Sequence, residues 1–402
     1  MGISGRLNHQ TLRAALRAAL MVLLWQSLAT PSLAAAGRQP ISQPASCIEN
    51  AGPLPASHPL PFRAQRVATF EYPWALAFLP DARLLVTEKP GRMFLVTQDG
   101  HKTEINGIPK VYYQGQNGLL DVAIAPGFAR DAAIYFTYVQ PEVRGGGSLV
   151  LARARLNPDD PHPRLQQLTT IWRQTPPSTG GQPGGIIAFA PDGQHLFLSV
   201  GDRQEPDTAQ DPNLARGKIL HMNLDGSTPA DNPKARQGGI RALTWSTGHR
   251  NPYGLAFAPD GQLWEHEMGP RGGDELNRIQ RDGNYGWPLV SYGDQYSGKP
   301  IARPPSRPEF LEPSIYWTPV IAPAGMVFYS GALFPAWRGS ALIGGLQSRG
   351  LVRVVFADDG SARQADRWTL GQRIRNVAVA PDGAVWTIGD QAQGALMRLT
   401  PR

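Results

Sequence analysis

The sequence is poor in cysteine, in charged residues and in helical patterning. It contains a single cysteine in 402 residues, which excludes a disulfide framework, a thiolate zinc cluster and an iron–sulfur cluster held by this chain alone. Charged residues make up 18% of the chain, less than the roughly 25% of typical soluble proteins. No long segment repeats its apolar residues at a spacing of 3.6, so the composition disfavours a mainly helical fold.

Turn-forming residues are what the chain has in excess. It contains 44 glycines and 38 prolines, about a fifth of the chain against about 12% in average proteins. Hydrophobic residues reach 41%, which is too many for a disordered chain. The excess positive charge is mild and dispersed, and no aromatic–basic recognition motif occurs, so we expect no nucleic-acid partner. This composition favours an all-β protein with many tight turns.

The first 34 residues have the pattern of an export signal. Three arginines precede an apolar run over residues 18–25, and no acidic residue occurs before Glu49. Residues 32–34, Ser-Leu-Ala, form a small-x-small cleavage pattern, so residues 1–34 are predicted to be a Sec-type signal peptide. The apolar run is too short to serve comfortably as an anchor. We therefore expect a periplasmic or secreted protein with no membrane span after cleavage, and a net charge that falls from +7 to +4.

The remaining chain divides into a leader over 35–62, rich in Pro, Ser and Ala and expected to be loose, and one domain over 63–402. A recurring unit runs through this domain: a strand, then Pro-Asp-Gly or a relative, then a second strand. Asp-Gly between alternating strands predicts a hairpin, because glycine adopts positive φ without steric cost. Hairpin-rich repeats of this size are typical of a β-propeller. Six markers predict six blades, at Pro80, Pro126, Pro191, Pro259, Pro335 and Pro381.

The propeller prediction has two consequences for the rest of the chain. A strand over 66–70 is expected to complete the last blade and close the ring, which leaves no open sheet edge. The longer insertions, over 140–185 and 269–306, are expected to build a site on one face. The alternative folds are a β-sandwich or two separate β domains, and markers that recur over about 300 residues argue against both.

Five motifs together resemble the soluble pyrroloquinoline quinone (PQQ)-dependent sugar dehydrogenases, the glucose/sorbosone and aldose sugar dehydrogenase family. They are GQNGLLD (115–121), GHRNPYGLAF (248–257), GPRGGDELN (269–277), NYGWP (284–288) and GQRIR (371–375). The resemblance covers roughly residues 66–400. It implies a six-bladed propeller that oxidises an aldose sugar to its lactone by hydride transfer to the quinone, assisted by calcium. It also implies an electron acceptor, which the sequence does not identify.

The resemblance implies a set of residues that contact the cofactor. PQQ carries three carboxylates, and a planar guanidinium pairs with a carboxylate bidentately. Arg373 and Arg375 are two residues apart and face the same side if they lie on a strand; without the resemblance, a solvated strand face explains them equally well. Thr318 matches a loop that faces sugar and cofactor, although Trp317 beside it also fits a core position. The full implied set is Gln116, Arg250, Asn251, Thr318, Arg373 and Arg375.

Two calcium sites are also implied by the resemblance. The carbonyls of Gly269 and Pro270 match ligands of a catalytic calcium, and Glu275 with the carbonyl of Tyr285 matches a structural calcium site. Calcium takes hard oxygen ligands, including backbone carbonyls. Without the resemblance, Gly-Pro is a turn and Glu275 an ordinary loop carboxylate.

The match fails at the position of the general base. In the segment 178–189, Gln182 stands where the family has histidine, and Ile186 stands where it has arginine. A glutamine side chain cannot accept a proton at neutral pH and therefore cannot act as a general base. Gln347 replaces a lysine that often binds the cofactor in relatives, and Met268 replaces a histidine or glutamine.

These departures leave two functions open. In the first, the protein is a sugar dehydrogenase whose general base is unassigned. His162 or His266 could reach the site and replace the missing base. In the second, it is a catalytically degenerate propeller that acts as a sugar- or protein-binding module. A metal-dependent lactonase is a weaker competitor, because no convergent set of Glu, Asn and Asp can be placed at the channel mouth.

Overall fold

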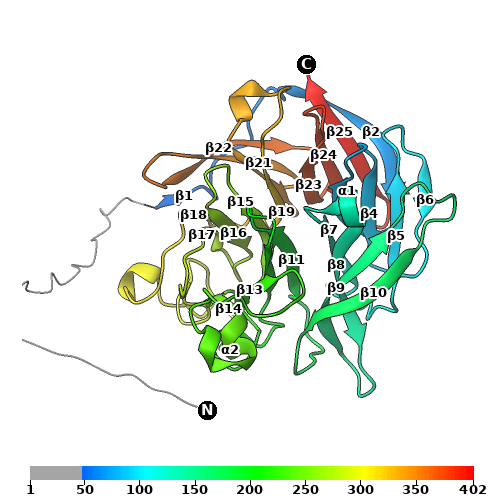
Figure 1. Ribbon diagram of the computed structural model, residues 1–402. Coiled ribbons are helices and arrows are strands. Elements are labelled where there is room, and N and C mark those ends of the chain that lie inside the picture. The colour runs from blue at the N-terminus through cyan, green and yellow to red at the C-terminus, as the bar shows by residue number, and fades with distance from the viewer. Residues whose placement is uncertain (1–47) are drawn as a thin grey trace, which may run out of the picture. The chain divides into compact units, whose positions relative to one another are not determined.

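The computed structural model describes residues 48–402. The expected signal peptide and residues 35–47 of the expected leader, which include Cys47, lie outside this range. The strands of the described part form six small sheets arranged as a six-bladed β-propeller (Figure 1). The all-β, six-bladed prediction is therefore confirmed.

Each blade is a sheet of four consecutive antiparallel strands, except where a strand from the N-terminal side joins it. Blade one comprises β3 (Pro73–Phe78), β4 (Leu84–Glu88), β5 (Arg92–Val96) and β6 (Lys102–Glu104). Blade two comprises β7 (Leu119–Ile124), β8 (Ala133–Pro141), β9 (Gly147–Leu156) and β10 (Leu165–Arg173). Blade three comprises β11 (Gly184–Phe189), β12 (His195–Val200), β13 (Lys218–Asn223) and β14 (Thr244–Thr247).

The second half of the ring follows the same plan. Blade four comprises β15 (Pro252–Phe257), β16 (Leu263–Glu267), β17 (Asp274–Arg278) and β18 (Ile315–Trp317), extended by β1 (Glu49–Asn50). Blade five comprises β19 (Pro323–Phe328), β20 (Ala341–Gly345), β21 (Gly350–Phe356) and β22 (Ala362–Thr369). Blade six comprises β23 (Ile374–Val379), β24 (Val385–Gly389), β25 (Gly394–Pro401) and β2 (Phe62–Phe70). The helices are short: α1 (Phe128–Asp131), α2 (Gly239–Leu243), η1 (Pro206–Gln210), η2 (Ala235–Gln237), η3 (Pro304–Ser306) and η4 (Pro335–Trp337).

The sequence repeat corresponds to one position in every blade. Each marker proline lies between the first and second strand, as Pro80 does between β3 and β4 and Pro381 does between β23 and β24. The first strands pack against one another around a complete ring, from β3 through β7, β11, β15, β19 and β23 back to β3. Because these six strands surround the axis, the loops that lead into them meet at one end of it.

The ring is closed by the N-terminal strand. β2 pairs antiparallel with β25, with Phe62 opposite Pro401 and Phe70 opposite Gly394, and Figure 1 shows these two strands side by side. The predicted closing strand over 66–70 is present and begins earlier, at Phe62. Closure joins the first and last parts of the domain in one sheet and removes the open edge that a linear array would leave.

The end of the expected leader is ordered against blade four. β1 pairs parallel with β18, and the Asn50 side chain bonds both backbone groups of Thr318: its Nδ2 donates to the carbonyl at 3.0 Å and its Oδ1 accepts from the amide at 2.9 Å. Ala51 is fully buried. The expectation of a loose leader is therefore wrong for residues 49–52, because these contacts satisfy a blade edge that would otherwise face water.

The insertion over 140–185 also differs from expectation. It contains β9 and β10, which complete blade two, and only the segment after β10 leads into β11 and the axis. The insertion over 269–306 contains β17 and a long connection towards β18. No helix among the described residues is both long and apolar enough to cross a membrane.

Candidate active site at one end of the propeller axis

The site is built from segments that lead into the first strands of four blades. Gln116 precedes β7, Gln182 precedes β11, Arg250 precedes β15 and Arg373 precedes β23. These positions are far apart in sequence, and the ring of first strands brings them to the same end of the axis. The arrangement matches the general rule that propeller sites lie in loops around the central channel.

Gln182 connects two of the predicted cofactor residues. Its side chain is 7% exposed and its φ is +52°. With the amide oriented to satisfy both neighbours, its NH₂ donates to Asp202 Oδ1 at 2.6 Å and its oxygen accepts from Arg250 Nη2 at 3.0 Å. Its backbone amide donates to Gln116 Oε1 at 2.5 Å. The structure thus places Gln182 among charged and polar groups rather than in an apolar core.

Arg250 links Gln182 to the Gly-Pro loop. Its Nη1 donates to the carbonyls of Met268 and Gly269, both at 2.9 Å. The guanidinium also lies 5.3 Å from the centre of the Trp287 ring, an arrangement that stabilises a buried cation. Arg250 is therefore held in a fixed position between the segment that carries Gln182 and the loop that carries Gly269.

Asp202 is a site residue that the sequence motifs did not identify. It follows β12 directly and is 1% exposed. Its carboxylate accepts from Trp287 Nε1 at 2.9 Å and from the Gln204 amide at 2.8 Å, in addition to Gln182. Burial raises the pKa of Asp202 to about 6, although the hydrogen bonds and the charge of Arg250 oppose the shift. The available signal was an acidic residue at the end of a buried strand, which by itself has many structural explanations.

The two arginines of the GQRIR motif point to the same side and share a carboxylate. Arg373 Nη2 lies 3.1 Å and Arg375 Nη2 lies 2.9 Å from Asp390 Oδ2. Arg375 also stacks over the rings of Trp74 at 4.4 Å and Tyr253 at 5.5 Å, near the axis. Its Nε and Nη1 atoms are buried and have no hydrogen-bond partner among the described residues. Asp390 orients both guanidinium groups and leaves two donor atoms of Arg375 unused.

Lys89 is a fourth cation at this end of the axis and was also missed. It follows β4, is half-buried, and its Nζ lies 3.4 Å from the Gly115 carbonyl. Burial lowers the pKa of Lys89, while the charge of Asp390 raises it in part and the charges of Arg375 and Arg373 lower it further. The only sequence signal was a lysine in the turn Glu-Lys-Pro-Gly over 88–91.

The residues implied as calcium ligands lie around one small hollow. Gly269, Glu275 and Tyr285 line it together with Arg250, and its free volume is about 10 Å³. Pro270 follows Gly269 in the same loop. A side chain at Gly269 would place a Cβ 2.2 Å from the Gly272 carbonyl oxygen, so the close approach of this loop to itself requires glycine.

Two side chains, of which Asp274 is buried, hold this loop in place. Asp274 accepts the backbone amides of Gly269, Ile321 and Ala322 at 3.0, 2.8 and 2.7 Å, and burial raises its pKa to about 7. Thr318 Oγ1 accepts the Gly273 amide at 2.8 Å. Thr318 therefore supports the Gly-Pro loop.

Other predicted positions differ in their surroundings. Trp317 is 0% exposed and its Nε1 donates to Gln364 at 3.0 Å, so it is a core residue and not a sugar-facing one. Asn251 is fully buried and its backbone N–H donates to Glu267 Oε2 at 3.3 Å, whereas its side-chain Oδ1 has no partner among the described residues. Ile186 lines a hollow at the axis with Trp74, Tyr253 and Arg375.

The two histidines considered as replacement bases do not contact Gln182. His266 is fully buried on β16 against Gly254, and burial lowers its pKa to about 3. His162 is exposed in the turn between β9 and β10, where its backbone amide donates to Asp160. The structure assigns both histidines to other parts of the blades.

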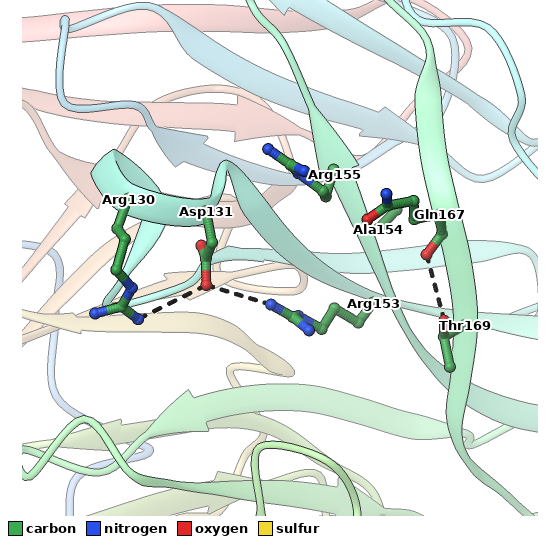
Figure 2. A pocket seen from close by; sticks show the side chains of 7 residues that line it. All are labelled: Arg130, Asp131, Arg153, Ala154, Arg155, Gln167 and Thr169. Atoms are coloured by element: carbon green, nitrogen blue, oxygen red, sulfur yellow. Dashed lines mark hydrogen bonds and ion pairs between the residues drawn. The ribbon is translucent and has the colours of Figure 1, made fainter.

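A larger hollow on blade two is separate from this site. It has a volume of about 350 Å³ and is lined by residues from α1, β9 and β10. Figure 2 shows Arg130 and Arg153 pointing to Asp131, at 3.8 and 3.2 Å. None of the residues predicted for cofactor or metal binding lines this hollow, so the axial site is the candidate for the chemistry.

Comparison with known proteins agrees with the motifs. The family profile of glucose/sorbosone dehydrogenase matches residues 70–398. Aldose sugar dehydrogenase YliI of Escherichia coli K12 is 37% identical over 343 residues, which is 83% of this chain and 91% of that protein.

Solved structures give the same result. The apo form of the soluble aldose sugar dehydrogenase from Escherichia coli has a TM-score of 0.79 at 36% identity, covering 85% of this chain and 100% of that one. The PQQ-bound aldose sugar dehydrogenase from Streptomyces coelicolor has a TM-score of 0.70 at 27% identity, covering 87% of this chain and 99% of that one. The protein therefore belongs to the glucose/sorbosone dehydrogenase family of oxidoreductases.

Proposed function

We propose that this protein oxidises an aldose sugar to its lactone with PQQ as the electron-accepting cofactor and calcium as the assisting metal. The observation that carries the proposal is the gathering of Lys89, Arg250, Arg373 and Arg375 at one end of the axis. A cofactor with three carboxylates requires such a concentration of cations. The PQQ-bound relative from Streptomyces coelicolor supports this choice of cofactor.

The residues present fit the cofactor. Arg375 has two buried donor atoms without partners, which a carboxylate of PQQ would satisfy. The resemblance implies a cofactor-binding lysine at position 347, where this chain has glutamine. In this proposal Lys89 supplies the positive charge instead. Gln116, Asn251 and Thr318 complete the proposed set of cofactor contacts, as the resemblance implies.

The proposed calcium ligands are oxygen atoms of the hollow described above. The carbonyls of Gly269 and Pro270 would hold the catalytic ion, and Glu275 with the carbonyl of Tyr285 would hold the structural one. All are hard oxygen donors of the kind that calcium prefers. Bound at these residues, PQQ would supply the hydride-accepting quinone, and calcium held by the loop would supply a positive charge that polarises it.

Asp202 is our candidate for the proton acceptor. It is the carboxylate that contacts Gln182, at the position of the family's base. A base is most effective when its pKa is close to the working pH, and burial raises the pKa of Asp202 to about 6. In this proposal Gln182 keeps Asp202 and Arg250 connected through its amide but does not itself take the proton.

The alternative function is a degenerate propeller that binds a sugar or a protein without turnover. The observation in its favour is the neutral amide of Gln182 where catalysis in the family uses an imidazole. Both functions are compatible with export by the predicted signal peptide to the periplasm or the outside of the cell, which we propose for this chain.

Titration of the purified protein with PQQ and calcium separates these functions. We expect saturable PQQ binding that calcium strengthens, followed by aldose oxidation with an artificial electron acceptor. Binding without turnover would favour the binding module, and absence of PQQ binding would contradict the proposed dehydrogenase.

A lysine substitution tests the contribution of the fourth cation. Lys89→Met should weaken PQQ binding by about tenfold, because one partly buried charge pair with a carboxylate contributes on the order of 1–2 kcal/mol. Lys110→Met is the matched control, since Lys110 is exposed and lies outside the proposed contacts. Equal PQQ affinities of the two variants, measured by fluorescence titration, would remove Lys89 from the site.

The pH dependence of turnover tests Asp202. Its side chain faces the charges of Arg250 and Glu267, and its carboxylate must be ionised to accept a proton. Turnover should therefore rise as the pH increases through about 6 and level off above it. Asp202→Asn should lower kcat by at least about 100-fold. An unchanged pH–rate profile in this variant would assign the base to another group.

A further inference from the structure

A second polar cluster lies in blade four, between β16 and β17, where apolar side chains would be expected. Across these antiparallel strands Glu267 faces Glu275 and Glu265 faces Asn277. All four side chains are buried. Residues that face each other across a strand pair project to the same side of the sheet, and like charges in that position destabilise it. Glu275 is a proposed calcium ligand, and the two carboxylates of Glu265 and Glu267 on the same face require further positive charge.

The described residues provide little of this compensation. Within 48–402, no lysine or arginine side chain forms an ion pair with Glu265, Glu267 or Glu275, and His249 is the only basic partner. The guanidinium of Arg250 is engaged with backbone carbonyls and Gln182 instead. One oxygen of Glu267 accepts backbone amides, from Arg250 and Asn251, and its other oxygen faces His249.

The spacing within the cluster is that of ligands around an ion. His249 Nδ1 lies 3.4 Å from Glu267 Oε1 and 3.7 Å from Glu265 Oε2, and one ligand atom from each residue falls within 4.8 Å of the others. A charge-assisted N–H···O bond is shorter, about 2.7–2.9 Å. Ligand bonds of about 2.0–2.2 Å in a tetrahedral site give ligand–ligand edges of about 3.3–3.6 Å.

Two further oxygen atoms lack partners. Glu265 Oε1 and Asn277 Oδ1 are buried without a hydrogen bond among the described residues, and both side chains are 0% exposed. Asn277 Nδ2 donates to Glu265 Oε2 at 3.0 Å, so its amide lies at the edge of the cluster. Buried polar atoms are satisfied in nearly all native structures, so each unpartnered one points to a missing ligand.

The histidine is oriented as a metal ligand is. His249 Nε2 lies 2.9 Å from Ser246 Oγ, and the ring stacks on Tyr285 at 4.8 Å. When Nε2–H donates to Ser246, the lone pair of Nδ1 faces two carboxylates and requires a cation between them. Metal-binding histidines are characteristically fixed by a hydrogen bond at their other nitrogen.

We propose that His249, Glu265 and Glu267 bind a divalent transition-metal ion such as zinc, with Asn277 or a water molecule as a further ligand. An imidazole with carboxylates suits zinc and neighbouring transition metals, whereas calcium prefers oxygen atoms alone. The ligand set differs from Gly269, Pro270, Glu275 and Tyr285, the residues proposed for calcium, and does not depend on PQQ binding. The ion would tie the segment that carries Arg250 and Asn251 to β16.

Metal analysis of the PQQ-free protein tests the site. The chain is stripped with a chelator, exposed to zinc or to calcium, desalted and analysed by mass spectrometry, with thermal unfolding in parallel. We expect about one tightly held zinc per chain and a rise in Tm, because an ion that binds only the folded state stabilises it. Calcium is expected at its own proposed ligands, so protein already loaded with calcium should retain the same amount of zinc. A wild-type protein that retains no zinc would overturn the proposal.

Matched substitutions locate the ion. Glu265→Gln keeps the shape of the side chain and should abolish zinc retention, whereas Glu104→Gln, the same change at an exposed position on blade one, should not. If Glu265→Gln fails to fold, copper loading provides a second readout. Pulsed electron paramagnetic resonance should then detect an imidazole nitrogen in wild type that His249→Gln removes. Retention of the zinc in Glu265→Gln, or of the nitrogen signal in His249→Gln, would contradict this assignment.

Discussion

Replacing Gln182 by histidine is expected to raise the kcat of aldose oxidation by about 100-fold, the lower end of what a positioned general base contributes. The new imidazole would stand beside Asp202, which contacts the present side chain at 2.6 Å. A carboxylate at that distance orients an imidazole and stabilises its protonated form. Histidine also tolerates the backbone of this position, where φ is +52°, better than most residues do.

Steady-state kinetics of the PQQ- and calcium-loaded variant measure this effect. Gln167→His is the matched control, because Gln167 also has a positive φ, of 51°, but is exposed on β10, away from the axial site. We expect the control to keep the wild-type rate. If Gln182→His turns over no faster than wild type, an imidazole at position 182 does not act as the base in this site, and Asp202 remains the candidate.

Replacing Arg250 by methionine is expected to weaken PQQ binding by at least about 100-fold. The substitution removes a buried cation that donates to two carbonyls and to Gln182. In the proposed complex the same guanidinium would also donate to a PQQ oxygen, and a charge-assisted hydrogen bond contributes about 1.5–3 kcal/mol. A loss of 1.4 kcal/mol corresponds to a factor of ten in affinity. Because the carbonyls of Met268 and Gly269 also lose their partner, the Gly-Pro loop should become less ordered and calcium affinity should fall with it.

Equilibrium binding of PQQ and of calcium, each measured separately, tests this second expectation. Arg236→Met serves as the control, since Arg236 is exposed in η2. A Tm close to that of wild type would show that the variant remains folded. Unchanged affinities for both ligands in a folded Arg250→Met protein would exclude Arg250 from the cofactor site.

The fold was predictable because the repeat is local. Each marker, such as Pro80 or Pro381, lies in a short turn between adjacent strands, and the residues that specify the turn are neighbours in sequence. The closing strand was predictable for a similar reason. The sequence has one more strand before the first marker than blade one needs, and that strand can pair with the last blade. The ordered structure of residues 49–52 was not predictable, because it depends on a hydrogen bond between Asn50 and Thr318, which are 268 positions apart in the sequence.

The site was predictable only in part. The motifs identified Gln116, Gln182 and Arg250, which the structure brings into contact. They did not identify Asp202 or Lys89, because an acid after a strand and a lysine in a turn are common in any β protein. Their position near the axis follows from the ring of first strands and from nothing in their own neighbourhoods.

The sequence by itself determined the turn chemistry, the number of blades and the glutamine at position 182, because each of these is specified by a short stretch of residues. Only the tertiary structure decided which charges meet. Asp390 lies between Arg373 and Arg375, and His249 lies between Glu265 and Glu267. Electrostatic interaction depends on distance and burial rather than on sequence separation, and both quantities exist only once the ring has closed.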